Sequence, residues 1–120
     1  MLKQERKRKE NLLPKGIPRW VRCYDIGGST ADRYTVVFTG RYKKNRGECI
    51  FLGMSEKPFH PQGFCQHGFS PQMSDTVKGG WPPSIGKKCC LGTRIPFTEL
   101  PEDCQKVVIN DYKELWDISN

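Results

Sequence analysis

The segment Asp32-Arg-Tyr-Thr-Val-Val-Phe-Thr-Gly40 decides the fold of this chain. Tyr34, Val36 and Phe38 share one face of this segment, and the residues between them share the other. This period of two is typical of a β-strand with two different environments. Tyrosine, valine, phenylalanine and threonine also fit a pleated, half-buried surface. We therefore predict a strand over Asp32–Gly40, the clearest in the chain.

Two further strands flank this one in the sequence. Arg19–Asp25 precedes it, and Glu48–Ser55 follows it. The links are short: a glycine-containing loop before the central strand, and the basic turn Arg41–Gly47 after it. Consecutive strands with short links form an antiparallel meander by default. Later in the chain, Leu91–Pro96 is predicted to add a short fourth strand.

The C-terminal segment predicts an amphipathic helix. It begins near Leu100-Pro-Glu-Asp103, where proline suits a first helical turn and the acidic residues complement the helix dipole. Apolar residues then recur at spacings of three and four, which gives one apolar stripe. The stripe consists of Cys104, Val107, Val108, Tyr112, Leu115 and Trp116. We expect this stripe to cover one face of the sheet and to complete the core.

Between these regions, Glu56–Cys90 is rich in proline and glycine and shows no regular period. Irregular segments longer than about 12–15 residues are uncommon and are functional or disordered. The phenylalanines and the tryptophan in this segment argue against disorder, because disordered segments contain few aromatic residues. The predicted fold class is therefore α+β: a small antiparallel sheet of three to five strands, with the C-terminal amphipathic helix packed on it and a long ordered loop.

Length and charge suggest one domain with a basic arm. A chain of 120 residues has room for a single domain. We expect residues 1–16 to form a basic flexible arm and residues 17–120 to form a single α+β domain. The net charge is +7, and residues 1–22 hold eight of the 20 basic side chains but two of the 13 acidic ones. Such an arm favours phosphate-rich partners through counterion release, but the more ordinary explanation is a solvated tail that keeps the protein soluble.

The sequence also indicates a compartment. No apolar run approaches the roughly 20 residues of a membrane helix, and the N-terminus is charged where a signal peptide has an apolar core. We therefore expect a cytoplasmic protein without membrane association. In that compartment the six cysteines are expected to be reduced thiols.

One short segment concentrates residues that can carry chemistry. His60, Cys65 and His67 lie within eight residues, and both residue types are natural zinc ligands. Their spacing does not match familiar structural zinc motifs, so zinc stays an alternative and no cofactor is expected. A nucleophilic pair of Cys65 with either histidine lacks an activating helix N-terminus or a third, orienting residue. The sequence therefore predicts no catalytic residue, and favours binding over enzymatic activity.

Five motifs together resemble a known group of proteins. They are DRYTVVFT (32–39), LGMS (52–55), PFHPQG (58–63), QHG (66–68) and LPEDCQKV (100–107). In these the chain resembles small uncharacterised accessory proteins encoded by bacteriophages, prophages and related mobile elements, from about Val21 to Trp116. The resemblance implies an accessory phage gene, whose product binds and redirects host or phage machinery. It carries over no functional residue.

These observations lead to one expected function. We expect a non-catalytic phage accessory protein of the host-takeover or counter-defence type, which binds a host or phage protein or a small nucleotide ligand. Loops on rigid scaffolds carry most binding functions, and histidine, glutamine and aromatic side chains suit base edges and stacking. The predicted ligand-binding residues, all in the loop Pro58–Ser70, are His60, Gln62, Phe64, Gln66 and His67.

Two alternatives stay open. The first is a nucleic-acid-binding accessory protein that uses the basic arm and the basic turn. Its contact residues would be Arg6, Lys7, Arg8, Lys9, Arg41, Lys43, Lys44 and Arg46. The second is a small zinc-binding protein or enzyme, with His60, Cys65 and His67 as ligands.

Overall fold

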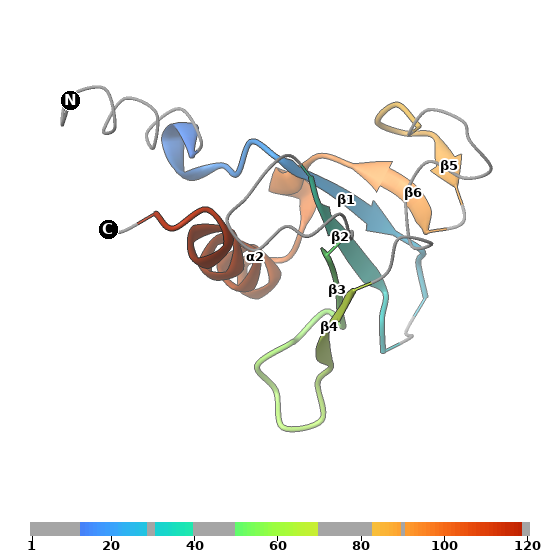
Figure 1. Cartoon of the computed structure of the whole chain (residues 1–120). Helices are drawn as coiled ribbons and strands as arrows, with labels where there is room; N and C mark the ends of the chain where they lie inside the picture. Colours follow the sequence, from blue (N-terminus) through green and yellow to red (C-terminus); the bar gives the residue numbers. More distant parts are fainter. Residues whose placement is uncertain (1–12, 29–30, 40–49, 70–82, 90, 119–120) are drawn as a thin grey trace, which may run out of the picture.

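The computed structural model describes residues 13–28, 31–39, 50–69, 83–89 and 91–118. In these residues the chain forms one antiparallel sheet of six strands and one C-terminal α-helix, so the fold is α+β, as predicted (Figure 1). The strands are β1 (Val21–Asp25), β2 (Tyr34–Phe38), β3 (Ile50–Met54), β4 (Cys65–Phe69), β5 (Lys88–Cys89) and β6 (Gly92–Ile95). Their order across the sheet is β4-β3-β2-β1-β6-β5. The helices are η1 (Pro14–Gly16), η3 (Phe97–Glu99) and α2 (Glu102–Leu115).

The predicted antiparallel meander is present. β2 pairs with β1 on one side and with β3 on the other, and Val36 lies opposite Cys23 and Leu52. The predicted fourth strand is also present, as β6. It returns to the free side of β1, where Ile95 lies opposite Cys23. The meander and the later part of the chain therefore meet at β1, inside the sheet.

The number of strands is higher than the three to five predicted, because β4 and β5 both lie in the segment Glu56–Cys90 that was predicted to be irregular. β4 pairs with β3 along its whole length, from Met54 opposite Cys65 to Ile50 opposite Phe69. Its sequence contains no valine, isoleucine or threonine, so local propensity does not reveal it. Of the rest of the predicted loop, residues 56–64 and 83–87 contain no strand, and residues 70–82 and 90 lie outside the described residues.

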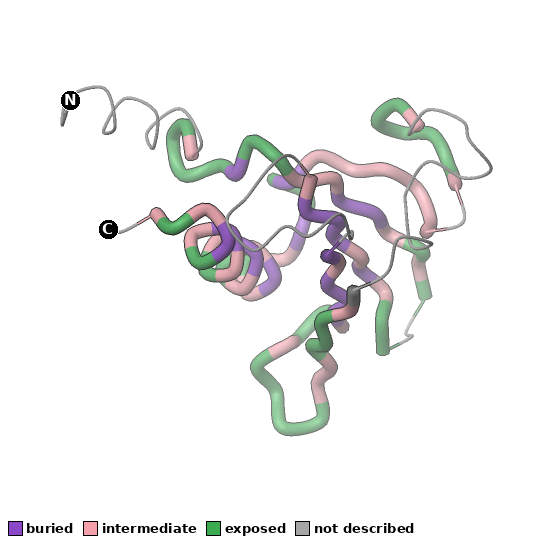
Figure 2. The backbone as a smooth tube through the Cα atoms, in the orientation of Figure 1, coloured by how far each residue is buried: buried purple, intermediate pink, exposed green. Residues whose placement is uncertain are grey.

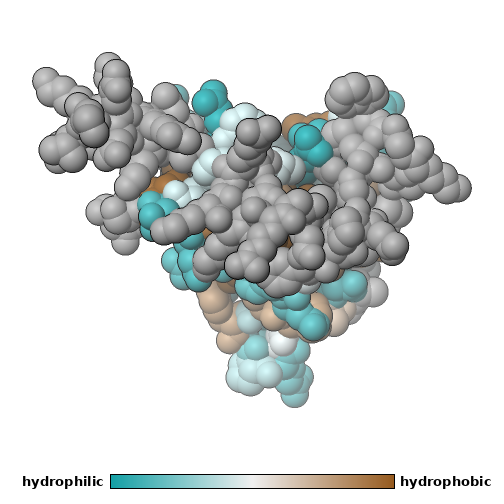
Figure 3. Space-filling model, viewed as in Figure 1, coloured by the Kyte–Doolittle hydropathy of each residue, from teal (hydrophilic) through white to brown (hydrophobic). Residues whose placement is uncertain are grey.

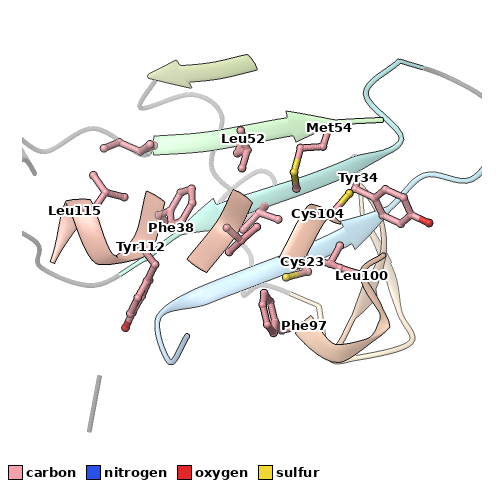
Figure 4. Close-up of a cluster of buried hydrophobic side chains, with 13 residues drawn as sticks. Cys23, Tyr34, Phe38, Leu52, Met54, Phe97, Leu100, Cys104, Tyr112 and Leu115 are labelled. Atoms are coloured by element: carbon pink, nitrogen blue, oxygen red, sulfur yellow. The ribbon is translucent and has the colours of Figure 1, made fainter. Parts of the chain in front are cut away.

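The C-terminal helix is confirmed, and it completes the core as expected. Pro101 precedes the first turn of α2, and Glu102 and Asp103 lie in that turn. α2 packs on one face of the sheet, and its buried side chains meet those of β1, β2 and β3 (Figures 1 and 4). The fully or nearly fully buried residues of this core are Cys23, Tyr34, Val36, Phe38, Ile50, Leu52, Met54, Phe97, Leu100, Cys104, Val108, Tyr112 and Leu115.

Two predictions of the sequence analysis fall mainly on residues that the structure does not describe. Of the predicted arm, residues 1–12 lie outside the described residues, and Pro14–Gly16 form the short 3-10 helix η1. The basic turn Arg41–Gly47 lies outside them as well. Within the described parts of the chain, no helix has the length and apolar character needed to cross a membrane.

The face of the sheet away from α2 lies outside the core cluster. Alternation along the strands places Tyr24, Thr35, Val37, Phe51 and Gly53 on the side away from α2. Tyr24 and Val37 are buried there, although neither belongs to the core cluster beneath α2. This face positions the candidate site.

Candidate functional site

A cavity of about 500 Å³ opens on the face of the sheet away from α2. We call it the face cavity. The described residues that line it are Ile26, Asp32, Thr35, Phe51, Gly53, Phe64, Gln66, His67, Gly68 and Leu91. Cavities of roughly 300–1,000 Å³ with an apolar lining and a few convergent polar groups are the usual sites for small ligands.

The register of three strands builds the floor of the face cavity. Thr35 of β2 lies opposite Gly53 of β3, which lies opposite Gln66 of β4, so the three form one row across the sheet. The glycine in the middle of the row leaves space between the flanking side chains. A Cβ at this position would meet the Cβ of Asp32 at 3.5 Å and the ring of Phe64 at 3.6 Å. Asp32 and Phe64 therefore stand on either side of the glycine.

A second glycine fixes an aromatic side chain in the neighbouring row. Phe51 lies opposite Gly68, and a Cβ at Gly68 would lie 2.2 Å from Cζ of the phenylalanine ring. The ring thus lies directly over the glycine backbone. Glycine inside a strand is unfavourable for the strand itself and marks a close approach of another group. Here the group is the aromatic wall of the cavity.

The lining of the face cavity combines two aromatic rings with a small number of polar groups. Phe51 and Phe64 supply apolar faces on which a planar ligand can stack. Gln66 offers an amide with both donors and an acceptor, and Thr35 offers a hydroxyl. Asp32 is exposed and supplies a carboxylate, while none of the described lining residues is a lysine or arginine. The arrangement suits a flat, neutral group that carries hydrogen-bond donors.

A second, smaller cavity of about 320 Å³ lies at the loop that joins β3 and β4. We call it the loop pocket. It is lined by Gly28, Arg33, Ser55, Glu56, Lys57, His60, Gln62 and Gly63. The loop extends beyond the sheet and is largely exposed, and its tip carries hydrophilic residues (Figures 2 and 3). In contrast to the face cavity, this pocket is lined by two basic side chains and one acidic one.

Hydrogen bonds within the loop give it a defined shape. The N–H of His60 donates to the carbonyl of Lys57 at 3.1 Å, and the N–H of Gly63 donates to the carbonyl of His60 at 2.8 Å. A side chain at Gly63 would place its Cβ 2.0 Å from the carbonyl oxygen of Lys57, so this turn requires glycine. The N–H of Gln62 donates to Nδ1 of His60 at 3.1 Å. In a neutral imidazole the proton is then on Nε2, which is a donor.

An ion-pair network anchors the loop to the sheet. Nε of Arg33 donates to Oδ1 of Asp25 at 3.0 Å, and its guanidinium also donates to Glu56. Oδ1 of Asp25 additionally accepts the N–H of Gly27 at 2.8 Å, as expected for an aspartate before a glycine turn. The hydrogen bond from Arg33 lowers the pKa of Asp25, against the opposing effect of burial. The same bond raises the pKa of Arg33.

The linings of the two cavities include residues that are neighbours in the chain. Asp32 lines the face cavity, and the next residue, Arg33, lines the loop pocket. In the same way, Gly63 lines the loop pocket, and the next residue, Phe64, lines the face cavity. Ser55 of the loop pocket is bonded to Phe64 twice, through its backbone N–H at 3.0 Å and its hydroxyl oxygen at 2.9 Å. This bonded pair therefore links the lining of the loop pocket to that of the face cavity.

The structure divides the predicted recognition surface. His60 and Gln62 line the loop pocket, whereas Phe64 and Gln66 line the face cavity. His67 contributes to the lining of the face cavity, but its side chain lies on the other side of the sheet. There its Nε2 lies 2.6 Å from Oδ2 of Asp111 in α2.

The candidate zinc ligands are not assembled. His60 lies in the loop, while Cys65 and His67 lie in β4, and the described residues contain no group of three histidine, cysteine or acidic side chains with the geometry of a metal site. The thiol of Cys65 is not activated either. Burial raises its pKa, and the nearby carboxylate of Asp111 raises it further.

Several residues of the two cavities were not predicted. Asp32, Thr35 and Phe51 line the face cavity, and Arg33 and Lys57 line the loop pocket. The signal that points to the first three is the pair of glycines inside strands, Gly53 and Gly68, because such glycines mark close approach. No comparable local signal points to Arg33 or Lys57.

The described residues thus form an α+β protein in which one helix covers one face of a six-stranded sheet. The other face of the sheet carries a cavity large enough for a small molecule. Comparisons of this chain with protein-family models, with curated proteins and with solved structures found no match.

Proposed function

We propose that this chain is a non-catalytic binding protein whose ligand is a small nucleotide, with the base held in the face cavity. The observation that carries the proposal is the convergence of Phe51, Phe64 and Gln66 on one cavity of about 500 Å³. Aromatic stacking is worth about 1–3 kcal/mol for each base and tolerates any base, because every base has a π-face. An amide beside the rings adds recognition of the base edge.

The polar groups support a base rather than an anion in this cavity. Asp32 is acceptor-only when ionised, and it therefore pairs with the amino or imino groups of a base edge. A phosphate at the same place would face like charge, without a described lysine or arginine in the lining to offset it. The base therefore enters the cavity, and the phosphate lies outside it.

Several features support binding over catalysis. The raised pKa of Cys65 disfavours the thiolate that a nucleophile needs. His67 is engaged with Asp111 on the far side of the sheet from the cavity. On this proposal the protein acts in the host cytoplasm, as a phage accessory protein of the counter-defence type that withholds a nucleotide from its receptor.

Calorimetric titration of the whole chain with adenosine, guanosine, cytidine and uridine tests this function. We expect at least one nucleoside to bind, and Phe64→Ala to weaken it about tenfold or more, given the stacking energy. Phe59→Ala is the matched control, because Phe59 lies in the same loop, is 62% exposed and lines neither cavity. Absence of binding by all four nucleosides would exclude the proposal, as would equal losses in the two variants.

A further inference from the structure

We infer that the loop pocket is the phosphate subsite of the same ligand, so that one nucleotide spans both cavities. This inference rests on the proposed function. Its first support is that the two linings meet in the fold: Ser55 of the loop pocket is hydrogen-bonded to Phe64 of the face cavity, and Arg33 of the loop pocket directly follows Asp32 of the face cavity. On this inference, a ligand whose base stacks on Phe64 extends past Ser55 and places its phosphate in the loop pocket.

Charge supports the same orientation. Among the described residues, the lining of the face cavity includes the acidic side chain of Asp32. The lining of the loop pocket includes two basic side chains, Arg33 and Lys57, and one acidic side chain, Glu56. Arg33 is ion-paired with Asp25 and Glu56, so the charges of Arg33 and Glu56 are both compensated within the protein, and Lys57 is the remaining cation of the described lining. Lys57 is exposed, and no described carboxylate is within ion-pair distance of it. An anionic group is therefore more stable in the loop pocket than in the face cavity.

The loop also presents hydrogen-bond donors to this pocket. Because Nδ1 of His60 accepts the N–H of Gln62, the neutral imidazole carries its proton on Nε2 and can donate it. The side-chain amide of Gln62 is a further donor in the lining. Phosphate oxygens are strong acceptors, and hydrogen bonds to a charged group are roughly twice as strong as neutral ones. Lys57, His60 and Gln62 together thus form a set that fits a phosphate monoester.

The loop is held in place for this role before any ligand binds. Internal hydrogen bonds link Lys57, His60 and Gly63, and the bond from Arg33 to Glu56 ties the loop to the residue that precedes β2. A preformed site loses less conformational entropy on binding than a flexible one, and its donors therefore contribute more to affinity. The chain thus offers a nucleotide two prepared subsites, with an apolar one for the base and a basic one for the phosphate.

The test compares nucleosides with their 5′-monophosphates, with guanosine against GMP and adenosine against AMP as the probes. In the wild-type chain we expect the monophosphate to bind at least tenfold more tightly than its nucleoside, and to lose this advantage as salt rises. In Lys57→Gln we expect the affinity for the monophosphate to fall about tenfold, while that for the nucleoside stays unchanged.

Lys15→Gln is the matched control, because it removes the same charge from η1, outside the lining of both cavities. It is expected to change neither affinity. The phosphate subsite would be excluded if the wild type bound nucleoside and monophosphate equally, or if the Lys57 and Lys15 variants lost equal affinity for the monophosphate. Either result would leave the proposed base site unaffected. If neither nucleosides nor monophosphates bind, the base site and the phosphate subsite both fall.

Discussion

The ring of Phe51 lies directly over the backbone of Gly68, its partner on the neighbouring edge strand. The two residues are complementary: the glycine has no side chain, and the ring occupies the space that a Cβ would take. This relationship holds the ring as one wall of the face cavity. It also links the sequence of β4, which is otherwise poor in strand-forming residues, to the shape of the candidate site.

We predict that Gly68→Ala destabilises the fold by about 1–3 kcal/mol, because the new Cβ collides with the ring and either the ring or β4 must shift. Gly53→Ala is the internal comparison. Its Cβ would meet its neighbours at 3.5 and 3.6 Å, which are ordinary contacts, so its effect on stability should stay within about 1 kcal/mol. Urea denaturation of both variants measures the difference. If Gly68→Ala were no less stable than Gly53→Ala, the ring would not be fixed over Gly68.

Acid should weaken the anchor between the loop and the sheet. The hydrogen bond from Arg33 lowers the pKa of Asp25 below its usual 3.8, so the folded state holds the ionised form more strongly than the unfolded state does. The resulting stability is fully present above about pH 4 and is lost as the pH falls through the folded-state pKa. We expect Asp25→Asn to be less stable than the wild type at pH 6, with the gap narrowing as the pH falls below about 4 towards the lowered folded-state pKa of Asp25, as measured by urea midpoints. A gap that persisted unchanged at low pH would contradict this role for Asp25.

The cysteines should differ in reactivity towards iodoacetamide at pH 8. Burial raises the pKa of Cys23 and of Cys104 to about 12, and both side chains are essentially inaccessible. Cys65 is exposed, although burial of its thiol raises its pKa as well. We expect peptide mass spectrometry of the native chain to find alkylation at Cys65 but not at Cys23 or Cys104, which should react only in denaturant. Rapid labelling of Cys104 in the native state would mean that α2 detaches from the sheet.

The hydroxyl of Tyr112 should contribute to stability by satisfying a backbone donor. The N–H of Trp20, just before β1, donates to this hydroxyl at 3.3 Å, and Tyr112 itself is fully buried. Tyr112→Phe preserves the packing of the ring but leaves that N–H without its acceptor. We expect a loss of about 1 kcal/mol in the free energy of unfolding. Thermal denaturation that showed a loss below about 0.3 kcal/mol would mean that water or another group replaces the hydroxyl.

Local sequence patterns predicted most of the fold. The alternation of Tyr34, Val36 and Phe38 identified β2, and the structure shows that the face they share is buried beneath α2. The three- and four-residue spacing from Cys104 onwards identified α2 in the same way. β4 was missed because its conformation comes from pairing with β3, and such long-range contacts leave no periodicity in a five-residue segment.

The candidate site was predicted only in part, and for a similar reason. The histidine, glutamine and aromatic side chains of the β3–β4 segment do line cavities, but a linear sequence does not show that His60 and Phe64 belong to two different ones. Phe64 packs near Gly53 of β3, and Gln66 reaches the face cavity through the row that it forms with Thr35 and Gly53 across three strands. The contributions of Asp32 and Phe51 depend on the same register, which no single segment specifies.

The position of β1 inside the sheet has a consequence for how the chain reaches its native state. Strands β1 to β4 pair with sequence neighbours, whereas β6 must find β1 from the far end of the chain, and α2 follows it. Closing so large a loop is entropically costly, and proteins dominated by such distant contacts fold slowly. During synthesis the meander therefore emerges before α2, with the side chains of Val36 and Leu52 exposed to solvent. Until α2 has left the ribosome, these apolar side chains are accessible to chaperones and to self-association.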